Sequence, residues 1–223
     1  MTPHSPRSLL ADQTVALIPV RSLTGGKTRL AGALDGAERA GLIGEMLGGV
    51  VSAAIASRMI GRIIVVSPDD DVLSLAGHLA PDLITLRQAG DRPGLIPALD
   101  QGRAFAIDGG AAAMLILFGD LPLLSADDVR TMATSAASVV ISPDRHGEGT
   151  NGLRLRFDSG TGRDDASRFV FRFGQGSFRK HLAEADRLGL TAATVVTAGT
   201  SLDVDTPADL AEWTARSETP AAH

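Results

Sequence analysis

The chain has 223 residues, 44% of them hydrophobic and 21% charged, which is enough apolar material for one continuous core and excludes a disordered or collagen-like protein. The 26 acidic residues outnumber the 21 basic ones, and a net charge of −5 with seven Phe, one Trp and no Tyr disfavours a nucleic-acid-binding protein. Cysteine is absent, so disulfides, thiolate nucleophiles and cysteine-bound metals are excluded.

The N-terminal part of the chain alternates apolar strands with helices. Residues 14–20 (TVALIPV) and residues 63–67 (IIVVS) have the continuous apolar character of strands buried on both faces of a parallel sheet. Between them, Asp35 and Glu38 have the spacing of a capping box, and apolar residues then recur at helical intervals. Strand, helix and strand in this order predict a parallel βαβ unit.

The same alternation continues toward the C-terminus. The expected elements are a helix near 72–79, a weak strand at 83–86, a helix within 95–107, a strand at 114–118, a helix beginning at Ser125, a strand at 139–142, a helix beginning at Ser177, a strand at 194–197 and a helix beginning at Pro207. Near residues 153–157, Leu and Phe alternate with Arg154 and Arg156, which is typical of a strand with one face in water. These elements predict an open α/β sheet with right-handed crossovers.

The sequence predicts neither a signal peptide nor a membrane span. The first thirty residues lack the basic-then-apolar pattern of a signal peptide, and the longest apolar run, residues 111–118, is too short to span a bilayer. We therefore expect a cytoplasmic protein without membrane contacts. We also expect a single domain over residues 14–216, with a flexible N-terminus at 1–13 and a flexible, small and polar tail at 217–223.

Three aspartates are candidates for a metal site. Asp120 directly follows the most apolar strand, where ligands bind in open α/β sheets, although an ordinary turn explains it equally well. In the run LDVD, an extended backbone would send Asp203 and Asp205 to one face and the apolar residues to the other. Capping of the next helix explains one of these acids but not the alternation. Together the three carboxylates are the hard oxygen ligands that Mg²⁺ prefers.

Two loops are candidates for anion binding. Residues 21–29 (RSLTGGKTR) include Arg21, Lys27 and Arg29 but no acid, and they lack the first glycine that a P-loop requires. Residues 173–177 (FGQGS) open a helix, where two glycines, a serine and free N–H groups can hold a phosphate. A flexible surface loop and a glycine turn with a capping serine are the respective alternatives.

Five motifs, in this order, resemble the guanylyltransferases that make the precursor of coenzyme F-420: VALIPVRSLTGGKTRLAG, LFGDLPLL, ISPDRHGEGTNGL, FGQGSFRKH and SLDVDTPADL. The resemblance covers residues 15–210. It implies an α/β fold with a Rossmann-like, open, mostly parallel sheet of the nucleotide-diphospho-sugar transferase type, to which the alternating strand adds an antiparallel extension in the C-terminal half. It also implies transfer of GMP from GTP to phosphoenolpyruvate, 2-phospho-L-lactate or 3-phospho-D-glycerate, with release of pyrophosphate. Related enzymes are often homodimers.

The resemblance also implies roles for individual residues. These are the Mg²⁺ ligands Asp120, Asp203 and Asp205; the acid-binding residues Thr150, Gly174 and Ser177; the nucleotide-binding residues Arg21, Lys27 and Gly94; and Lys27 and Arg29 as catalytic residues beside the leaving pyrophosphate. The family usually has Asn in a GLN motif where this chain has Ile96, so this motif does not imply guanine selectivity. A nucleotidyltransferase for another phosphorylated precursor is an alternative. A non-catalytic nucleotide-binding module is another, and it is expected to lack one of the three acids, all of which are present.

Overall fold

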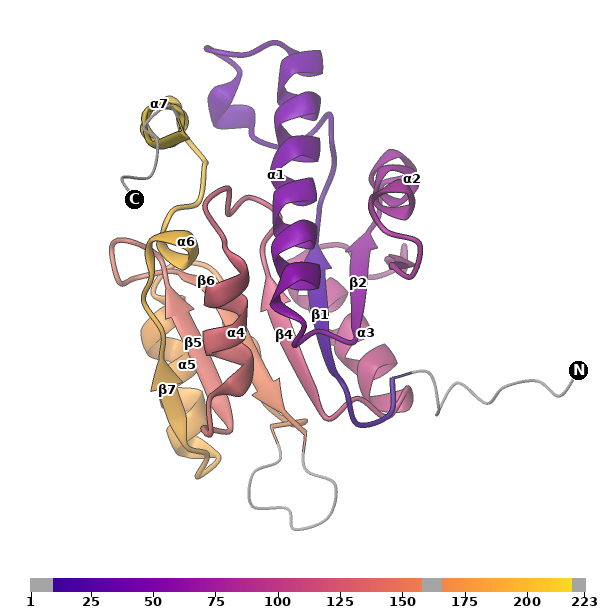
Figure 1. Cartoon of the computed structure of the whole chain (residues 1–223), viewed down its shortest axis with the longest axis vertical. Coiled ribbons are helices and arrows are strands. Elements are labelled where there is room, and N and C mark those ends of the chain that lie inside the picture. The colour runs from indigo at the N-terminus through magenta and orange to yellow at the C-terminus, as the bar shows by residue number, and fades with distance from the viewer. Residues whose placement is uncertain (1–9, 158–165, 218–223) are drawn as a thin grey trace, which may run out of the picture.

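Seven strands form one sheet in the computed structural model, which describes residues 10–157 and 166–217 (Figure 1). The strands are β1 (Thr14–Pro19), β2 (Arg62–Ser67), β3 (Ile84–Arg87), β4 (Ala113–Leu117), β5 (Val139–Pro143), β6 (Thr150–Arg156) and β7 (Ala192–Thr194). Their order is β3-β2-β1-β4-β6-β5-β7. Of the described strands, β6 alone runs antiparallel to its neighbours β4 and β5, and the other pairs are parallel. The expected open, mostly parallel α/β sheet is confirmed, and its antiparallel part is one reversed strand.

Helices cover both faces of this sheet (Figure 1). They are α1 (Gly36–Ser57), α2 (Asp70–Leu79), α3 (Leu95–Asp108), α4 (Ala126–Thr134), α5 (Ser177–Arg187), α6 (Ala198–Ser201) and α7 (Pro207–Ser217), with a 3-10 helix, η2, at Thr28–Leu30. Val15 and Leu17 of β1 pack in the cluster that contains α3 and α5 residues. Ala16 and Ile18 pack in the cluster on the opposite face, with α1, α2 and α4. Because both faces are covered, the central strands are continuously apolar.

The local signals for helix starts are confirmed by hydrogen bonds. The carboxylate of Asp35 accepts from the N–H of Glu38 at 2.8 Å, and Glu38 accepts from the N–H of Asp35 at 2.7 Å. Ser125 and Asp128 form the same reciprocal pair at the start of α4. These caps satisfy N–H groups that have no partner inside the helix, which is why their sequence spacing locates the two helix starts.

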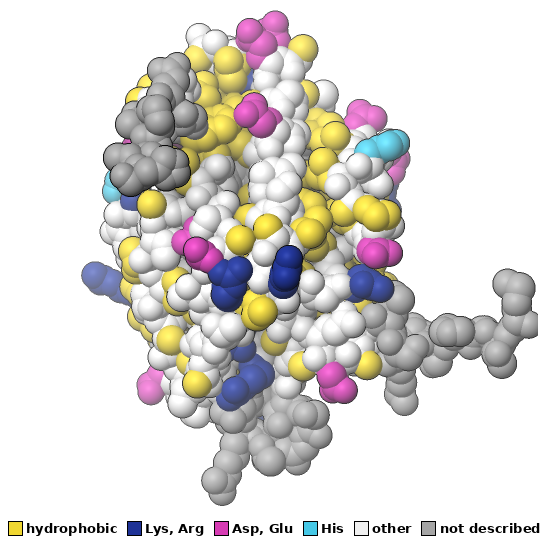
Figure 2. Space-filling model, viewed as in Figure 1, with side chains coloured by type: hydrophobic (Ala, Val, Ile, Leu, Met, Phe, Trp, Pro, Cys, Tyr) yellow, Lys and Arg dark blue, Asp and Glu magenta, His cyan; other side chains and the backbone are white. Residues whose placement is uncertain are grey.

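Helix α1 is long and apolar enough to span a membrane, the one such helix within the described part of the chain, with a mean hydropathy of 1.5 over its most apolar window. Half of that window is buried inside the protein, where α1 packs on the sheet and α4. This is the character of a core helix. On the face formed by α1, α2 and α4, charged side chains of both signs are scattered and do not form one large patch (Figure 2).

Two expectations about the C-terminal half are wrong. Strand β6 has no face in water at Arg154, which is 2% exposed, because the guanidinium donates to the carbonyl oxygens of Ser135 and Ala137 just beyond α4. Burial, together with the nearby charge of Arg156, lowers the pKa of Arg154 to about 10. The last strand lies at 192–194 instead of 194–197, because Thr197 caps the short helix α6.

The ends of the expected single domain fall largely outside the described residues. The segments 1–9 and 218–223, expected to be flexible, are not described. Leu10 belongs to the expected N-terminal segment, yet it is fully buried beside α3 residues in the core. The packed part of the protein therefore begins before β1.

Helix α3 contacts β1 closely through Gly102. A methyl group added at this position would lie 2.5 Å from Cδ1 of the fully buried Leu17, whereas one at Gly41 on α1 would meet no atom within 4 Å. Both Gly→Ala changes add helix propensity, so their difference isolates the overcrowding. We expect Gly102→Ala to unfold with a free energy about 1 to 3 kcal/mol lower than Gly41→Ala in urea titrations. Equal stabilities would contradict the close packing of α3 on β1.

Candidate functional site

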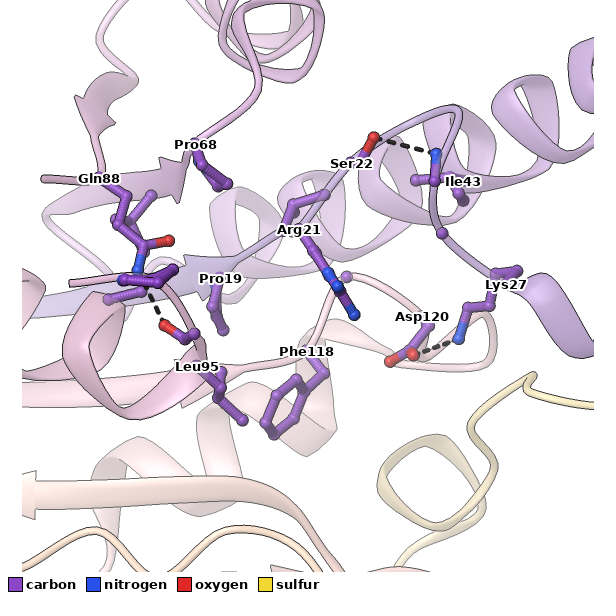
Figure 3. A pocket seen from close by; sticks show the side chains of 18 of the residues that line it. Pro19, Arg21, Ser22, Lys27, Ile43, Pro68, Gln88, Leu95, Phe118 and Asp120 are labelled. Carbon is purple, nitrogen blue, oxygen red and sulfur yellow. Dashed lines mark hydrogen bonds and ion pairs between the residues drawn. The ribbon is translucent and has the colours of Figure 1, made fainter. Parts of the chain in front are cut away.

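A cavity of about 870 Å³ opens beyond the carboxyl ends of the four parallel strands β1 to β4 (Figure 3). Each of these strands ends beside it, and the lining residues at those ends include Pro19, Pro68, Gln88 and Phe118. The loop after β1 and the start of α3 complete the walls. Ligands in open α/β sheets bind in this position, because successive strand ends leave a crevice there.

The ammonium group of Lys27 joins two acids from distant parts of the chain. It donates to Oδ2 of Asp120 and, at 2.6 Å, to Oδ1 of Asp205. The Lys27 side chain is 10% exposed, and its backbone has the left-handed φ of 52°, which is uncommon for a residue other than glycine. Burial alone would lower the pKa of Lys27, but the two carboxylates outweigh it and hold this pKa above its usual value. Lys27 is therefore a charged link between the loop after β1 and the two acids.

The LDVD segment has the expected alternation. Leu202 and Val204 are buried at 2% and 0% exposure, and the N–H of Val204 donates to the carbonyl oxygen of Asp120 at 3.2 Å. Val204 also packs with α1, η2 and α7 residues. The backbone bond and the buried valine hold the aspartates on either side of Val204 next to the end of β4.

Asp203 is the acid with the least favourable surroundings. Burial raises its pKa, and repulsion by Asp120 and Asp205 raises it further. The side-chain amide of Asn151, which donates to Asp203 Oδ1 at 3.2 Å, offsets part of this increase. A cation near Asp203 would relieve the repulsion.

The donor set suits a hard divalent cation, although the acids are not gathered around one point. No group of three or more His, Asp or Glu side chains within residues 10–157 and 166–217 is close enough to hold a metal ion. The ammonium of Lys27 lies between Asp120 and Asp205. Three carboxylates that repel one another still have the chemistry that Mg²⁺ requires, so these residues fit the ion by ligand type.

A second cluster of polar residues surrounds the buried imidazole of His181. Nε2 of His181 accepts from the backbone N–H of Arg172 at 3.0 Å, so the ring proton resides on Nδ1 and is donated to Oγ1 of Thr150, also at 3.0 Å. Burial lowers the pKa of His181 to about 4, against the opposing charge of Glu184. The imidazole is therefore neutral at physiological pH. Because the Thr150 oxygen accepts from His181, its own proton is available to a ligand.

The loop that opens α5 lies against this cluster. Gly174 and Gly176 have positive φ angles of 105° and 67°, and the buried Ser177 begins the helix. A side chain added at Gly174 would meet no atom within 4 Å, so the space beside its backbone is open. The glycines let the chain turn sharply into α5 and leave the backbone accessible.

Aromatic contacts connect the second cluster with the cavity. The ring of Phe118, which lines the cavity, meets the ring of Phe173 edge-on with centroids 5.4 Å apart. Phe173 in turn meets the ring of His181 with centroids 4.7 Å apart. Thr150 precedes Asn151, the partner of Asp203. The two sets of residues therefore belong to one continuous region.

The structure places most of the residues expected from the sequence in this region. Arg21, Lys27, Gly94, Asp120 and Asp205 line the cavity. Asp203 is electrostatically coupled to Asp120 and Asp205, and Thr150 and Ser177 lie with His181 in the second cluster, beside Gly174. Arg29 is exposed, and it is not among the residues that line the cavity. Of the two cations that the sequence places beside the leaving pyrophosphate, Lys27 lines the cavity and Arg29 does not.

Three polar residues of the region were missed from the sequence: Gln88, Asn151 and His181. Gln88 directly follows strand β3, and Asp120 comes three residues after the last residue of β4, so the rule that ligands bind at strand ends could have found Gln88 as well. His181 lies four residues after Ser177 in α5 and so shares its helix face. Nothing local identifies Asn151 as the partner of Asp203, because the two are separated by 52 residues.

Comparisons with known proteins agree with this architecture. Residues 14–221 match the family described as guanylyl transferase CofC like. The chain is 37% identical over 201 residues to a phosphoenolpyruvate guanylyltransferase from Sphaerobacter thermophilus, covering 89% of this chain and 91% of the relative. It is 39% identical over 202 residues to a 2-phospho-L-lactate guanylyltransferase from Methanothermobacter thermautotrophicus, covering 90% and 83%.

Solved structures resemble the chain in fold. A protein from Desulfovibrio desulfuricans, described as a nucleotide-diphospho-sugar transferase, aligns with a TM-score of 0.76 at 18% identity over 94% of this chain and 90% of that one. A nucleotidyl transferase from Methanothermobacter aligns with a TM-score of 0.64 at 17% identity over 92% and 98%. The expected nucleotide-diphospho-sugar transferase type of fold is therefore confirmed.

The neutral His181 predicts a specific loss of stability in acid. In the unfolded chain His181 has its ordinary pKa of 6.5, and in the folded protein about 4, so between these values the unfolded state binds a proton that the folded state does not. Stability should therefore fall as the pH drops from 6.5 to 4, by up to about 3 kcal/mol. In urea titrations, the free energy of unfolding should fall less between pH 7 and pH 4.5 for His181→Gln than for the wild type. The exposed His146→Gln serves as the control and should keep the wild-type pH dependence; equal behaviour of all three would contradict the buried neutral state.

Proposed function

The chain belongs to the guanylyl transferase CofC-like family and is a nucleotidyltransferase, and from this we propose that it transfers GMP from GTP to a small phosphorylated three-carbon acid in coenzyme F-420 biosynthesis. The names of the two relatives favour phosphoenolpyruvate or 2-phospho-L-lactate as the acid, with 3-phospho-D-glycerate as the third candidate. The observation that carries the proposal is the Lys27, Asp120 and Asp205 cluster at the carboxyl ends of the strands, beside the Thr150 and His181 pair.

The cavity provides distinct surroundings for the two ends of a nucleotide. Lys27 and Arg21 supply positive charge at the end near Asp120, where the triphosphate would lie (Figure 3). The opposite end, around Gly94 and Leu95, is uncharged and would hold the base. Arg29, exposed two residues after Lys27, is a further cation of the same loop that could reach the leaving pyrophosphate.

The cluster around His181 would hold the acid. Thr150 has a hydroxyl proton to donate, because its oxygen already accepts from His181. Ser177, in the first turn of α5, and the open backbone at Gly174 add polar groups that suit a phosphate or carboxylate. The aromatic contact between Phe118 and Phe173 would keep this acid next to the nucleotide.

The reaction is a displacement at the α-phosphorus of GTP. A phosphate oxygen of the acid forms the new bond to this phosphorus, the bond to the oxygen that bridges to the β-phosphorus breaks, and pyrophosphate leaves with that oxygen. A phosphate monoester has a second pKa near 6 and is already a dianion at neutral pH, so no general base is required. The protein contributes position and charge: Lys27 and Arg21 offset negative charge on the phosphates, and Thr150 orients the acid.

Asp120, Asp203 and Asp205 would hold Mg²⁺ in this site. When bound, the ion supplies positive charge that neutralises the phosphates. Asn151 fixes the orientation of the Asp203 carboxylate, and the N–H of Val204 ties the segment to Asp120. The buried Lys27 keeps the two acids it touches close together, despite their mutual repulsion.

The remaining expectations about partners complete the proposal. We propose a cytoplasmic homodimeric enzyme, with one domain over residues 14–216, that uses no nucleic acid or membrane as a partner. The half-buried α1 supports the absence of a membrane partner, and the scattered charges on the face it shares with α2 and α4 support the absence of a nucleic-acid partner (Figure 2). The presence of all three acids and Lys27 favours a catalyst over a non-catalytic nucleotide-binding module.

The direct test is incubation of the protein with Mg²⁺ and one nucleotide, in the presence of each of the three acids in turn. We expect a product whose mass equals that of the acid plus GMP less water, with equimolar pyrophosphate, for at least one acid and for GTP above ATP, CTP and UTP. A product formed from another nucleoside triphosphate would favour a different nucleotidyltransferase. No product with any combination would contradict the proposed function.

Asp203→Asn tests the metal ligands separately. Removing this carboxylate should reduce pyrophosphate release by more than about 100-fold. The thermal midpoint should stay the same or rise, because a buried and repelled charge is lost while the amide oxygen can still accept from Asn151. Asp186→Asn, which changes an exposed acid on α5, is the control and should retain activity. Near-normal turnover in Asp203→Asn would remove this residue from the metal site.

A further inference from the structure

We propose that Gln88 selects guanine, by accepting hydrogen bonds from the base through its side-chain carbonyl oxygen. This inference rests on the proposed function and names the residue that reads the base. Gln88 directly follows β3, where its backbone N–H continues the sheet by donating to the carbonyl oxygen of Ser67 at 2.9 Å. Its side chain lines the cavity and is 6% exposed, so it is held in place at the wall.

The amide of Gln88 can have only one orientation. Its Nε2 lies 2.8 Å from the carbonyl oxygen of Arg92 and 2.9 Å from that of Gly94, and both bonds require a donor on the side chain. Because carbonyl oxygens only accept, the NH₂ group must face this loop and Oε1 must face away from it. Figure 3 shows Oε1 directed into the cavity. Gln88 therefore presents a fixed acceptor there, with both of its donors already used.

The conformation of Gly94 makes this orientation possible. Its φ of 114° is one that side-chain-bearing residues rarely adopt, and the resulting turn aims its carbonyl oxygen at Gln88 just before α3 begins. Gly94 thus acts on the nucleotide through Gln88. Ile96, two residues after Gly94, packs against the hydrophobic core and lines a separate pocket with Phe171, so it does not line the nucleotide cavity.

A fixed acceptor distinguishes guanine from the other bases. The Watson–Crick edge of guanine presents two adjacent donors, N1–H and the 2-amino group, whereas adenine and cytosine present a ring acceptor beside an amino group. When the Gln88 carbonyl oxygen faces the ring acceptor of adenine or cytosine, two acceptors oppose each other without a proton between them. They repel, and neither is paired, which is costly in a buried site. Uracil has one ring donor between two acceptors and, as a pyrimidine, a smaller ring. The acceptor therefore favours guanine.

The position of Gln88 in the cavity suits the base. Gln88 lies at one end, Lys27 and Asp120 at the other, and Arg21 between them (Figure 3). Around Gln88 the wall is formed by uncharged residues, among them Leu95, which is 37% exposed. An apolar wall for the ring faces and one oriented polar atom for the edge is the usual composition of a ligand pocket.

Gln101 provides a matched control for the loop. Its Oε1 accepts from the N–H of Ala89 at 2.9 Å, and its Nε2 donates to the carbonyl oxygen of Arg87 at 2.8 Å, so it supports the backbone on both sides of Gln88. Gln101 is not among the residues that line the cavity. Replacing it disturbs the same loop without removing an acceptor that faces the nucleotide.

The experiment compares nucleotide binding by calorimetry, with Mg²⁺ and without an acid substrate, for the wild type, Gln88→Met and Gln101→Met. The ligands are GTP, ITP, which lacks the 2-amino group, N1-methyl-GTP, which lacks the N1 proton, and ATP. We expect Gln88→Met to bind GTP at least about tenfold more weakly and to lose at least about tenfold of the GTP to ATP preference. Gln101→Met should weaken the binding of GTP and of ATP by the same factor, so that the ratio of the two affinities stays at its wild-type value.

Three outcomes would overturn the inference. The first is a wild-type GTP to ATP ratio in Gln88→Met, and the second is an equal change of that ratio in both variants, which would indicate a structural role only. The third is that the wild type binds N1-methyl-GTP and ITP as tightly as GTP. This outcome can be measured even if Gln88→Met does not fold. The proposed function would be contradicted by a different result, namely that the wild type forms no guanylylated product with any acid. That result does not depend on which nucleotide the protein prefers to bind.

Discussion

The functional region depends on one buried ammonium group that holds acids from distant parts of the chain at one edge of the sheet. Lys27 is 93 residues from Asp120 and 178 residues from Asp205, yet it bonds to both. Without this cation, the carboxylates of Asp120 and Asp205 would repel each other and the nearby, mostly buried Asp203. The loop after β1, the end of β4 and the segment before α7 are therefore bound to one another by charge, and the cavity beyond the strand ends is formed beside this junction.

The second cluster of the region is centred on a neutral imidazole. His181 is linked to the cavity by ring contacts through Phe173 and Phe118. Burial keeps its imidazole neutral, and the hydrogen bond from the N–H of Arg172 makes the ring a donor to Thr150. Charge is thus concentrated at the strand ends, where phosphates and a metal ion would lie. The cluster around His181 would bind the substrate acid through oriented neutral groups, which do not compete with the three aspartates for a cation.

The side chains of Gln88 and His181 are oriented in the same way. Each has one end committed to backbone groups: two carbonyl oxygens for Gln88 and one N–H for His181. The backbone bonds leave the other end with a single polarity, an acceptor in Gln88 and a donor in His181. An amide or imidazole on a mobile side chain could present either polarity, so it would discriminate poorly between ligands. Here the fold fixes the polarity of both side chains.

What the sequence determined by itself was local. The buried strands, the capping boxes at Asp35 and Ser125, and the alternation in LDVD depend on neighbouring residues, so they were predictable. Tertiary structure alone decided which side chains meet. It buried Arg154 under α4, left Arg29 outside the cavity and oriented Gln88 and His181, because each of these outcomes depends on groups contributed by other elements.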